Sequence, residues 1–308
     1  MLDNLNIEHV YQQIIEMFAE YNSQFYLIYQ PRAIENKLTA SVSEKKLTLF
    51  EYRNYNIKFT PGLIALDLKQ PQDQTILKMT IEYSYLEIDP KAVLMAEPRF
   101  VFGWIFSPFI QQQLAKELGY ISIQSSDDGN QLLRYFDPAI LSPLSNILIE
   151  GQKQLLVNPV NAWLYINSDG VLITEKNLRS PIKNLSYNLG IIDEQWQKLD
   201  FIESRNQTIA RYHFFYPDYS LKEAQADIII MQSFQDAIQR GYSDKHDLSE
   251  YAYYSLVIHP DFIQHPIIQN EIKNNKTSSL IRQLKNIDAA QWQIVKNDLT
   301  VHLEGNKS

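Results

Sequence analysis

A run of seven almost entirely apolar residues, Phe100–Phe106, constrains the fold of this 308-residue chain more than any other feature. Such a short, continuous apolar run is typical of a buried β-strand. Ser107-Pro108 follows it and predicts an N-cap and a first-turn proline for a helix over residues 108–118, which Gly119 can end. The sequence therefore predicts a buried strand that leads directly into a helix.

The next residues predict a hairpin and a second junction of the same kind. Residues 120–124 alternate in hydrophobicity, and Asp128-Gly129 is a strong signal for a tight turn into a strand over 131–136. Asp137-Pro138 then repeats the pattern of N-cap and first-turn proline, for a helix to about residue 148. Further strands are predicted at 24–29, 62–68, 161–167 and 171–175, and further helices at 7–21 and 74–87.

Strands that alternate with helices and are joined by hairpins predict an α/β (α+β) domain with a mixed sheet over residues 1–178. The polar stretch 180–189 contains a proline and predicts a linker. Residues 190–308 are predicted to form an α-helical lobe. Its clearest helix starts at a capping box of Ser220 and Glu223 and ends at Arg240-Gly241. Shorter helices are predicted at 248–258, 266–273, 279–285 and 289–303.

Composition narrows the classes of function. Nine glycines disfavour a site built on glycine-rich phosphate loops, and the net charge of −8 argues against nucleic acid as a partner. The absence of cysteine excludes disulfides and thiolate chemistry. The acidic N-terminus does not resemble a signal peptide, and no apolar run reaches the roughly 18 residues of a membrane span. We expect a cytoplasmic protein that needs no cofactor and no membrane.

Several residues could in principle bind a metal or act in catalysis, but a structural role fits their positions better than a chemical one. His246, His259 and His265, with Asp261, could hold a metal in principle, but two of these histidines precede prolines and no spacing is that of a helical pair. Asp127 and Asp128 could serve as paired catalytic acids, but the run Asp-Asp-Gly-Asn is typical of a tight turn.

Arg134 and Asp137 could form a charged catalytic pair that clamps an anion. The helix cap explains the position of Asp137 better, because it accounts for the aspartate and the following proline together, and a pairing with Arg134 would then be structural. The chain also has nineteen tyrosines, and Tyr251, Tyr253 and Tyr254 would suit a protein-binding surface because tyrosine gives large contact area at low entropic cost.

The stretch around these junctions resembles the effector-chaperone, or adaptor, family of bacterial type VI secretion. The resemblance covers roughly residues 22–175, and its most specific part is the run Arg134-Tyr135-Phe136-Asp137-Pro138. Members often have an arginine after this proline, where this chain has Ala139. The positions that carry the resemblance are Trp104, Ser107, Pro108, Gly129, Arg134, Tyr135, Phe136, Asp137 and Pro138.

The resemblance implies a cytoplasmic, non-enzymatic protein that binds a cognate toxic effector and promotes its loading onto the valine-glycine-repeat (VgrG) spike. Two alternatives stay open. One is an immunity protein, which would bind a toxin to block its active site. The other is an enzyme with a cryptic site around Arg134, Asp127 and Asp128.

Overall fold

The computed structural model describes residues 4–31, 37–52, 57, 60–218, 221–275 and 277–305. The chain divides into two compact units. The first contains residues 1–92 and 96–200, and the second contains residues 201–308 together with Val93–Met95. The chain thus passes from the first unit to the second at Asp200, and the stretch 180–189 that was predicted as a linker belongs to the first unit.

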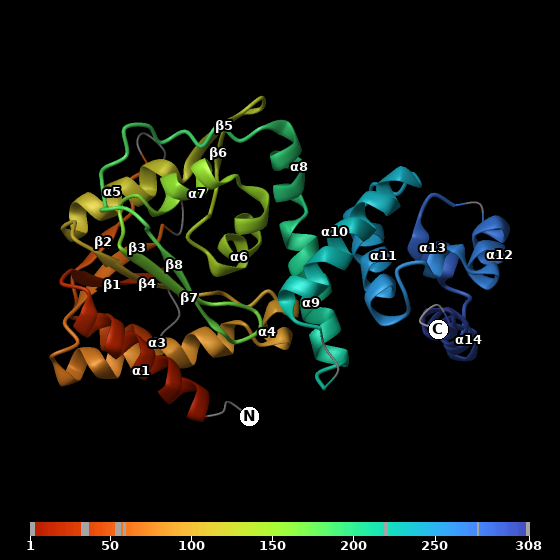
Figure 1. The fold of residues 1–308 in the computed structure, drawn as a ribbon, viewed down its shortest axis with the longest axis horizontal. Helices are drawn as coiled ribbons and strands as arrows, with labels where there is room; N and C mark the ends of the chain where they lie inside the picture. The colour runs from red at the N-terminus through yellow and green to blue at the C-terminus, as the bar shows by residue number, and fades with distance from the viewer. Residues whose placement is uncertain are drawn as a thin grey trace. The chain divides into compact units, whose positions relative to one another are not determined.

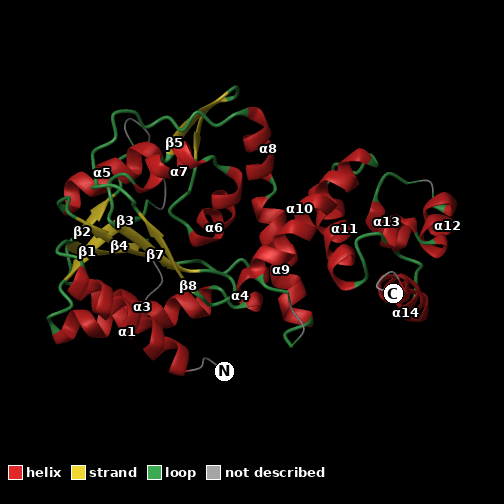
Figure 2. Ribbon diagram, viewed as in Figure 1, coloured by secondary structure: helices red, strands yellow, loops and turns green. Residues whose placement is uncertain are grey.

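The first unit combines helices with a central sheet (Figure 1, Figure 2). Its helices are α1 (Asn4–Glu20), α2 (Lys37–Val42), α3 (Pro71–Glu87), α4 (Pro90–Leu94, of which residues 93 and 94 are assigned to the second unit), α5 (Gln111–Ile121), α6 (Pro138–Ile147), α7 (Glu150–Val157) and α8 (Asp193–Asp200). Its strands are β1 (Gln24–Tyr29), β2 (Leu47–Leu49), β3 (Gly62–Leu66), β4 (Val101–Ser107), β5 (Ile123–Ser126), β6 (Gly129–Leu132), β7 (Ala162–Ile166) and β8 (Leu172–Lys176).

Six strands form the central sheet in the order β2-β3-β1-β4-β7-β8, and β5 and β6 form a separate hairpin. The prediction of an α+β fold is confirmed, but the prediction of a mixed sheet is wrong, because every neighbouring pair of strands runs antiparallel. Whether two neighbouring strands run parallel or antiparallel depends on how distant segments of the chain pair. The hydrophobic pattern of a single strand does not contain this information.

Helices cover both faces of the sheet, which explains why β1 and β4 are apolar without alternation. On one face, Leu27 and Trp104 pack with residues of α1 and α3. On the other, Tyr26 and Trp163 pack with residues of α5, α6 and α7. Figure 1 shows α1 and α3 below the sheet and α5, α6 and α7 above it. The predicted strand at 100–106 is therefore a central strand between two apolar layers.

Local boundaries differ from the prediction at two places. The strand after the hairpin ends at Leu132, and Arg134 to Phe136 form a turn before α6, whereas a strand was predicted to residue 136. Helix α5 runs on through Gly119 to Ile121. Gly119 does not end the helix: a Cβ at this position would lie 2.2 Å from the backbone oxygen of Glu51, so this glycine lets another segment pack closely against α5.

The second unit is helical in the part that the structure describes. Its elements are α9 (Ile202–Phe215), α10 (Glu223–Gln239), α11 (Lys245–Val257), the 3-10 helix η1 (Phe262–Gln264), α12 (Pro266–Asn274), α13 (Leu280–Leu284) and α14 (Ala289–Gly305). Gly241, with φ of 92°, follows α10 as predicted. Of the predicted capping box, Ser220 lies outside the described residues, and Glu223 is buried, with its carboxylate paired with Arg205.

Candidate functional site

The residues of β4 that carry the family resemblance are buried parts of the sheet. Trp104 is fully buried, and its indole Nε1–H donates to Oγ1 of Thr80 on α3 at 3.0 Å. Ser107, the last residue of β4, donates from Oγ to the carbonyl oxygen of Pro159 at 2.7 Å and accepts from the N–H of Phe109. This Oγ therefore joins two segments that lie 52 residues apart.

Ser107 and Pro108 do not begin the next helix as predicted. Helix α5 starts at Gln111, and its N-cap residue, Ile110, contributes no side-chain hydrogen bond. The hydroxyl group of Ser107 is already bound to Pro159 and Phe109, so it is not available to cap α5. A short connection that bends at Pro108 and Phe109 therefore joins the strand to the helix.

Asp137 is the centre of the run over residues 134–138, the most specific part of the resemblance, which we call the signature. Its Oδ1 accepts from the N–H of Ala139 at 3.0 Å, which confirms the predicted cap of α6, and Pro138 occupies the first turn. Its Oδ2 accepts from Arg134 Nη2 at 3.3 Å, so the predicted pair also forms. Arg99 Nη1 contacts Oδ1 at 3.2 Å, a partner that the sequence did not suggest because it lies 38 residues away.

Tyr135 and Phe136, between the two charged residues, belong to the core. Tyr135 is fully buried, and its hydroxyl donates to the carbonyl oxygen of Leu118 at 3.2 Å. The ring of Phe136 packs edge to face against those of Phe50 and Phe102. The guanidinium of Arg134 covers the Phe102 ring from 5.6 Å. The signature therefore attaches the start of α6 to one face of the sheet, so its role is structural.

Replacing Asp137 with alanine should lower the free energy of unfolding by about 1 to 2 kcal/mol, because α6 loses its cap and two arginines lose their partner. Thermal or urea unfolding measures this change. Asp137→Asn keeps a side-chain oxygen for the cap and removes the charge, so it should retain part of the lost stability. An unchanged unfolding curve for Asp137→Ala would contradict the assignment.

Glu87, at the end of α3, lies beside this network. Its Oε1 accepts from the N–H of Phe100 at 2.6 Å, and both carboxylate oxygens lie 3.3 Å from the N–H of Val101. Burial raises the pKa of Glu87 to about 8, although the Phe100 hydrogen bond and the positive charge of Arg99 oppose the rise. The carboxyl group therefore binds a proton more tightly in the folded chain than in the unfolded one.

This raised pKa predicts that stability falls as pH rises from about 5 to about 8. Between the usual carboxyl pKa and the raised value, the folded state carries more protons than the unfolded state, so its advantage is complete at low pH and is lost on deprotonation. The melting temperature measured across this pH range should fall more steeply in the wild type than in Glu87→Gln, which cannot titrate. Equal slopes would show that another group is responsible.

A long coil that follows β8 is anchored to the first unit by buried polar side chains. We call residues 177–192 the strap; Figure 1 shows it as the green coil that passes above α5 and α7 before α8. Glu117 of α5 is fully buried and accepts from the N–H of Asn184 at 3.1 Å and from the Tyr187 hydroxyl at 2.9 Å. The strap therefore satisfies a carboxylate that would otherwise be buried without a partner.

Two glutamines fix the rest of the strap in the same way. Gln124 donates to the carbonyl oxygen of Tyr187 at 2.7 Å and accepts from the N–H of Leu189 at 2.7 Å. Gln152 of α7 donates to the carbonyl oxygens of Leu189 and Gly190. Buried side chains thus hold the strap's backbone in one path, which is why this polar stretch is not a linker.

The strap turns apolar side chains outward on its other side. Leu178 is 87% exposed, Leu185 is fully exposed, and Ile182 and Ile192 are more than half exposed. Exposed aliphatic side chains on an anchored segment are available to contact another protein. This surface was not predicted from the sequence, because the same residues are typical of a linker.

The tyrosines that were predicted to contact a partner lie mostly inside the second unit. Tyr251 and Tyr253 are buried, and Tyr254 is half-buried with its ring stacked on Trp292 at 4.2 Å. The guanidinium of Arg211 lies 3.7 Å from the centre of the Tyr253 ring. Their surroundings are those of core residues.

The acids and histidines weighed as catalytic or metal-binding residues do not gather into one site, although His259 Nδ1 lies 3.7 Å from Asp261 Oδ2. Asp127 and Asp128 form the exposed turn between β5 and β6, and Gly129 follows with φ of 106°. His265 caps α12 through Nδ1, and its Nε2 lies 3.3 Å from Asp298. Within the described ranges, no three histidine, cysteine or acidic side chains are placed to share a metal ion.

Comparison of the chain with models of protein families, with curated proteins and with solved structures finds no match. In the described part of the chain, no helix combines the length and the apolar character that crossing a membrane requires. The structure adds the placement of the residues that carry the resemblance: Trp104, Ser107, Tyr135, Phe136 and Asp137 hold the fold of the first unit. The exposed apolar side chains of the strap lie outside the signature.

Proposed function

We propose that this protein is a cytoplasmic chaperone, or adaptor, which binds a cognate toxic effector and promotes its loading onto the VgrG spike of a type VI secretion system. The observation that carries the proposal is the strap, with its buried anchors and its outward aliphatic side chains. The resemblance in the signature stretch supplies the kind of partner.

A chaperone needs a surface that can cover apolar residues of another protein. The outward face of the strap, with Leu178, Ile182 and Leu185, offers such residues without any loss of core packing. Its backbone is already ordered by Glu117 and Gln124, so binding would not have to order it again. Ordering costs of about 1 to 2 kcal/mol per backbone residue are thereby avoided.

The test is co-expression with the cognate toxin, which is to be sought among the genes that neighbour this protein's gene. The amount of soluble toxin, its co-purification with this protein and its secretion should all depend on this protein. The double variant Leu178→Ser, Leu185→Ser should bind less toxin, whereas Leu5→Ser, which changes a comparably exposed leucine of α1, should not. A toxin that is equally soluble, stable and secreted without this protein would contradict the proposal.

The same experiment separates the proposed function from that of an immunity protein. An immunity protein protects cells against the active toxin and is not needed for delivery. Survival of toxin-expressing cells, measured together with secretion, decides between the two functions.

A further inference from the structure

Strand β8 ends the six-stranded sheet, and its outer edge carries backbone groups that can pair with another strand. The N–H of Asn177 donates to Asn161, and the N–H of Asn167 donates to the carbonyl oxygen of Val171, so the odd-numbered residues of β8 face β7. Leu172, Thr174 and Lys176 therefore direct their N–H and C=O groups away from β7. Among the described residues, no other segment forms backbone hydrogen bonds to this edge.

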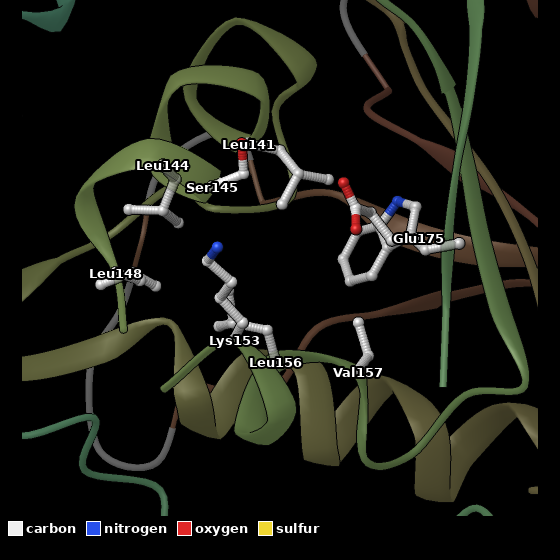
Figure 3. A pocket seen from close by; sticks show the side chains of 9 residues that line it. Leu141, Leu144, Ser145, Leu148, Lys153, Leu156, Val157 and Glu175 are labelled. Atoms are coloured by element: carbon white, nitrogen blue, oxygen red, sulfur yellow. The ribbon is translucent and has the colours of Figure 1, made fainter. Parts of the chain in front are cut away.

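A pocket lies on the face of the sheet beside this edge. It is open to solvent, and the space within it, including that solvent, amounts to about 390 Å³. Its lining residues come from α6, α7, β7 and β8: Leu141, Leu144, Ser145, Leu148, Lys153, Leu156, Val157, Trp163 and Glu175. Figure 3 shows Lys153 reaching from α7 into the space between the leucines, with Glu175 on the opposite side. The lining is mainly aliphatic, with one cation and one anion.

The chain around the pocket is basic, although the protein as a whole has a net charge of −8. Residues 176–192 contain Lys176, Arg179 and Lys183 and no acidic residue. Gln154 donates to Asn177 Oδ1 at 2.9 Å, which places this segment against α7, next to Lys153. None of these four cations forms an ion pair with another residue of the described chain.

We infer that an extended, acidic segment of the partner protein pairs with the outer edge of β8 and inserts an aliphatic side chain into this pocket. The inference rests on the proposed function and names the segment that the chaperone would recognise. Main-chain hydrogen bonds to the edge would give affinity, and the pocket and the four cations would give specificity.

The register follows from the geometry of an antiparallel ladder. Residues directly opposite each other in a ladder point to the same face of the sheet, as Trp163 and Glu175 already do. A partner residue opposite Glu175 would therefore face the pocket. Acidic neighbours of that residue would lie within reach of Lys176 and Arg179. The strap contains no acidic residue that could pair with these two cations.

The decisive variant is Thr174→Pro, assayed with the purified toxin by calorimetry or by interferometry. Thr174 directs its N–H outward, so proline removes one donor from the edge and none from the β7–β8 ladder. We expect its affinity for the toxin to fall at least about tenfold, which corresponds to about 1.4 kcal/mol. Thr174→Val keeps the N–H and should bind like the wild type.

Two further variants test the pocket and the charges. Ser145→Phe should fill the pocket and weaken binding to a similar extent. Lys153→Glu with Lys176→Glu should weaken binding by more than tenfold at low salt, whereas Lys69→Glu, an exposed lysine on the loop after β3, should leave the affinity unchanged. If Thr174→Pro does not fold by its melting curve, these variants decide the question.

The outcomes separate this inference from the proposed function. If the toxin does not bind the wild type, the proposed function fails and this inference fails with it. If the toxin binds and all edge, pocket and charge variants bind equally well, the inference is overturned and the proposed function stands. A wild-type dimer that Thr174→Pro dissociates would assign the edge to a second copy of this chain and would also overturn the inference.

Discussion

Arg205→Ala should destabilise the second unit by about 3 to 5 kcal/mol, the largest effect that we expect from a single substitution in this chain. The Arg205 side chain is 4% exposed and joins two helices. Its Nε donates to Asp227 Oδ1 at 2.7 Å, and its Nη2 donates to Glu223 Oε1 at 2.9 Å. Alanine would leave both carboxylates of α10 in a poorly solvated position without their cation.

The measurement is chemical denaturation of the whole protein, followed by the fluorescence of the tryptophans and by hydrogen exchange in α9 and α10. The matched control is Arg211→Ala on the same helix, which breaks a more exposed pair with Glu250 and should cost much less. The triple variant Arg205→Met, Glu223→Leu, Asp227→Leu removes the whole charged cluster and should recover most of the loss. Equal stability of Arg205→Ala and the wild type would show that these charges are well solvated.

Gly103→Ala should disrupt the centre of the sheet. This residue follows a β-bulge, because Tyr29 pairs with Val101 and Ile28 pairs with Gly103. Its φ is 116°, which L-residues rarely adopt, and a Cβ would lie 2.2 Å from the backbone oxygen of Leu164 on β7. The backbone conformation costs about 1 to 2 kcal/mol, and the overlap, which only a shift of the strand relieves, costs about 1 to 3 kcal/mol more.

Gly129→Ala provides the matched control for this prediction. Gly129 has a similar φ of 106°, but nothing lies within 4 Å of the position of an added Cβ. Its substitution should therefore show the conformational cost without the overlap, and the melting temperature should fall much less than for Gly103→Ala. Equal losses in the two variants would mean that β7 gives way easily at Leu164.

The signals that predicted the fold correctly are local ones. Asp137 caps α6 through the N–H of Ala139, two residues away, and the hairpin turn at Asp127 and Asp128 is also set by adjacent residues. The burial of Phe100–Phe106 follows from its composition alone. Each of these features depends on a few consecutive residues, so a single sequence contains all the information that it requires.

The predictions that were wrong depend on distant residues. Ser107 does not cap the next helix because its hydroxyl group binds Pro159. Gly119 does not end α5 but lies inside it, where the missing side chain lets the backbone of Glu51 approach closely. Residues 180–189 of the strap were predicted as a linker, because a polar stretch with a proline has the same composition in a linker as in an anchored coil. What distinguishes the two is a buried carboxylate, Glu117, 67 residues earlier in the chain. Tertiary contacts of this kind leave no pattern in the local sequence.

One side of the strap holds the segment in place, and its other side is exposed to solvent. Its path is fixed by side chains elsewhere in the first unit, such as Glu117, Gln124 and Gln152, whereas Leu178 and Leu185 project into solvent. Substitutions at the outward positions therefore cost little stability, since exposed sites away from packed contacts usually change it by about 0.5 kcal/mol or less. A surface built in this way can diverge rapidly between related proteins while the fold that carries it stays the same.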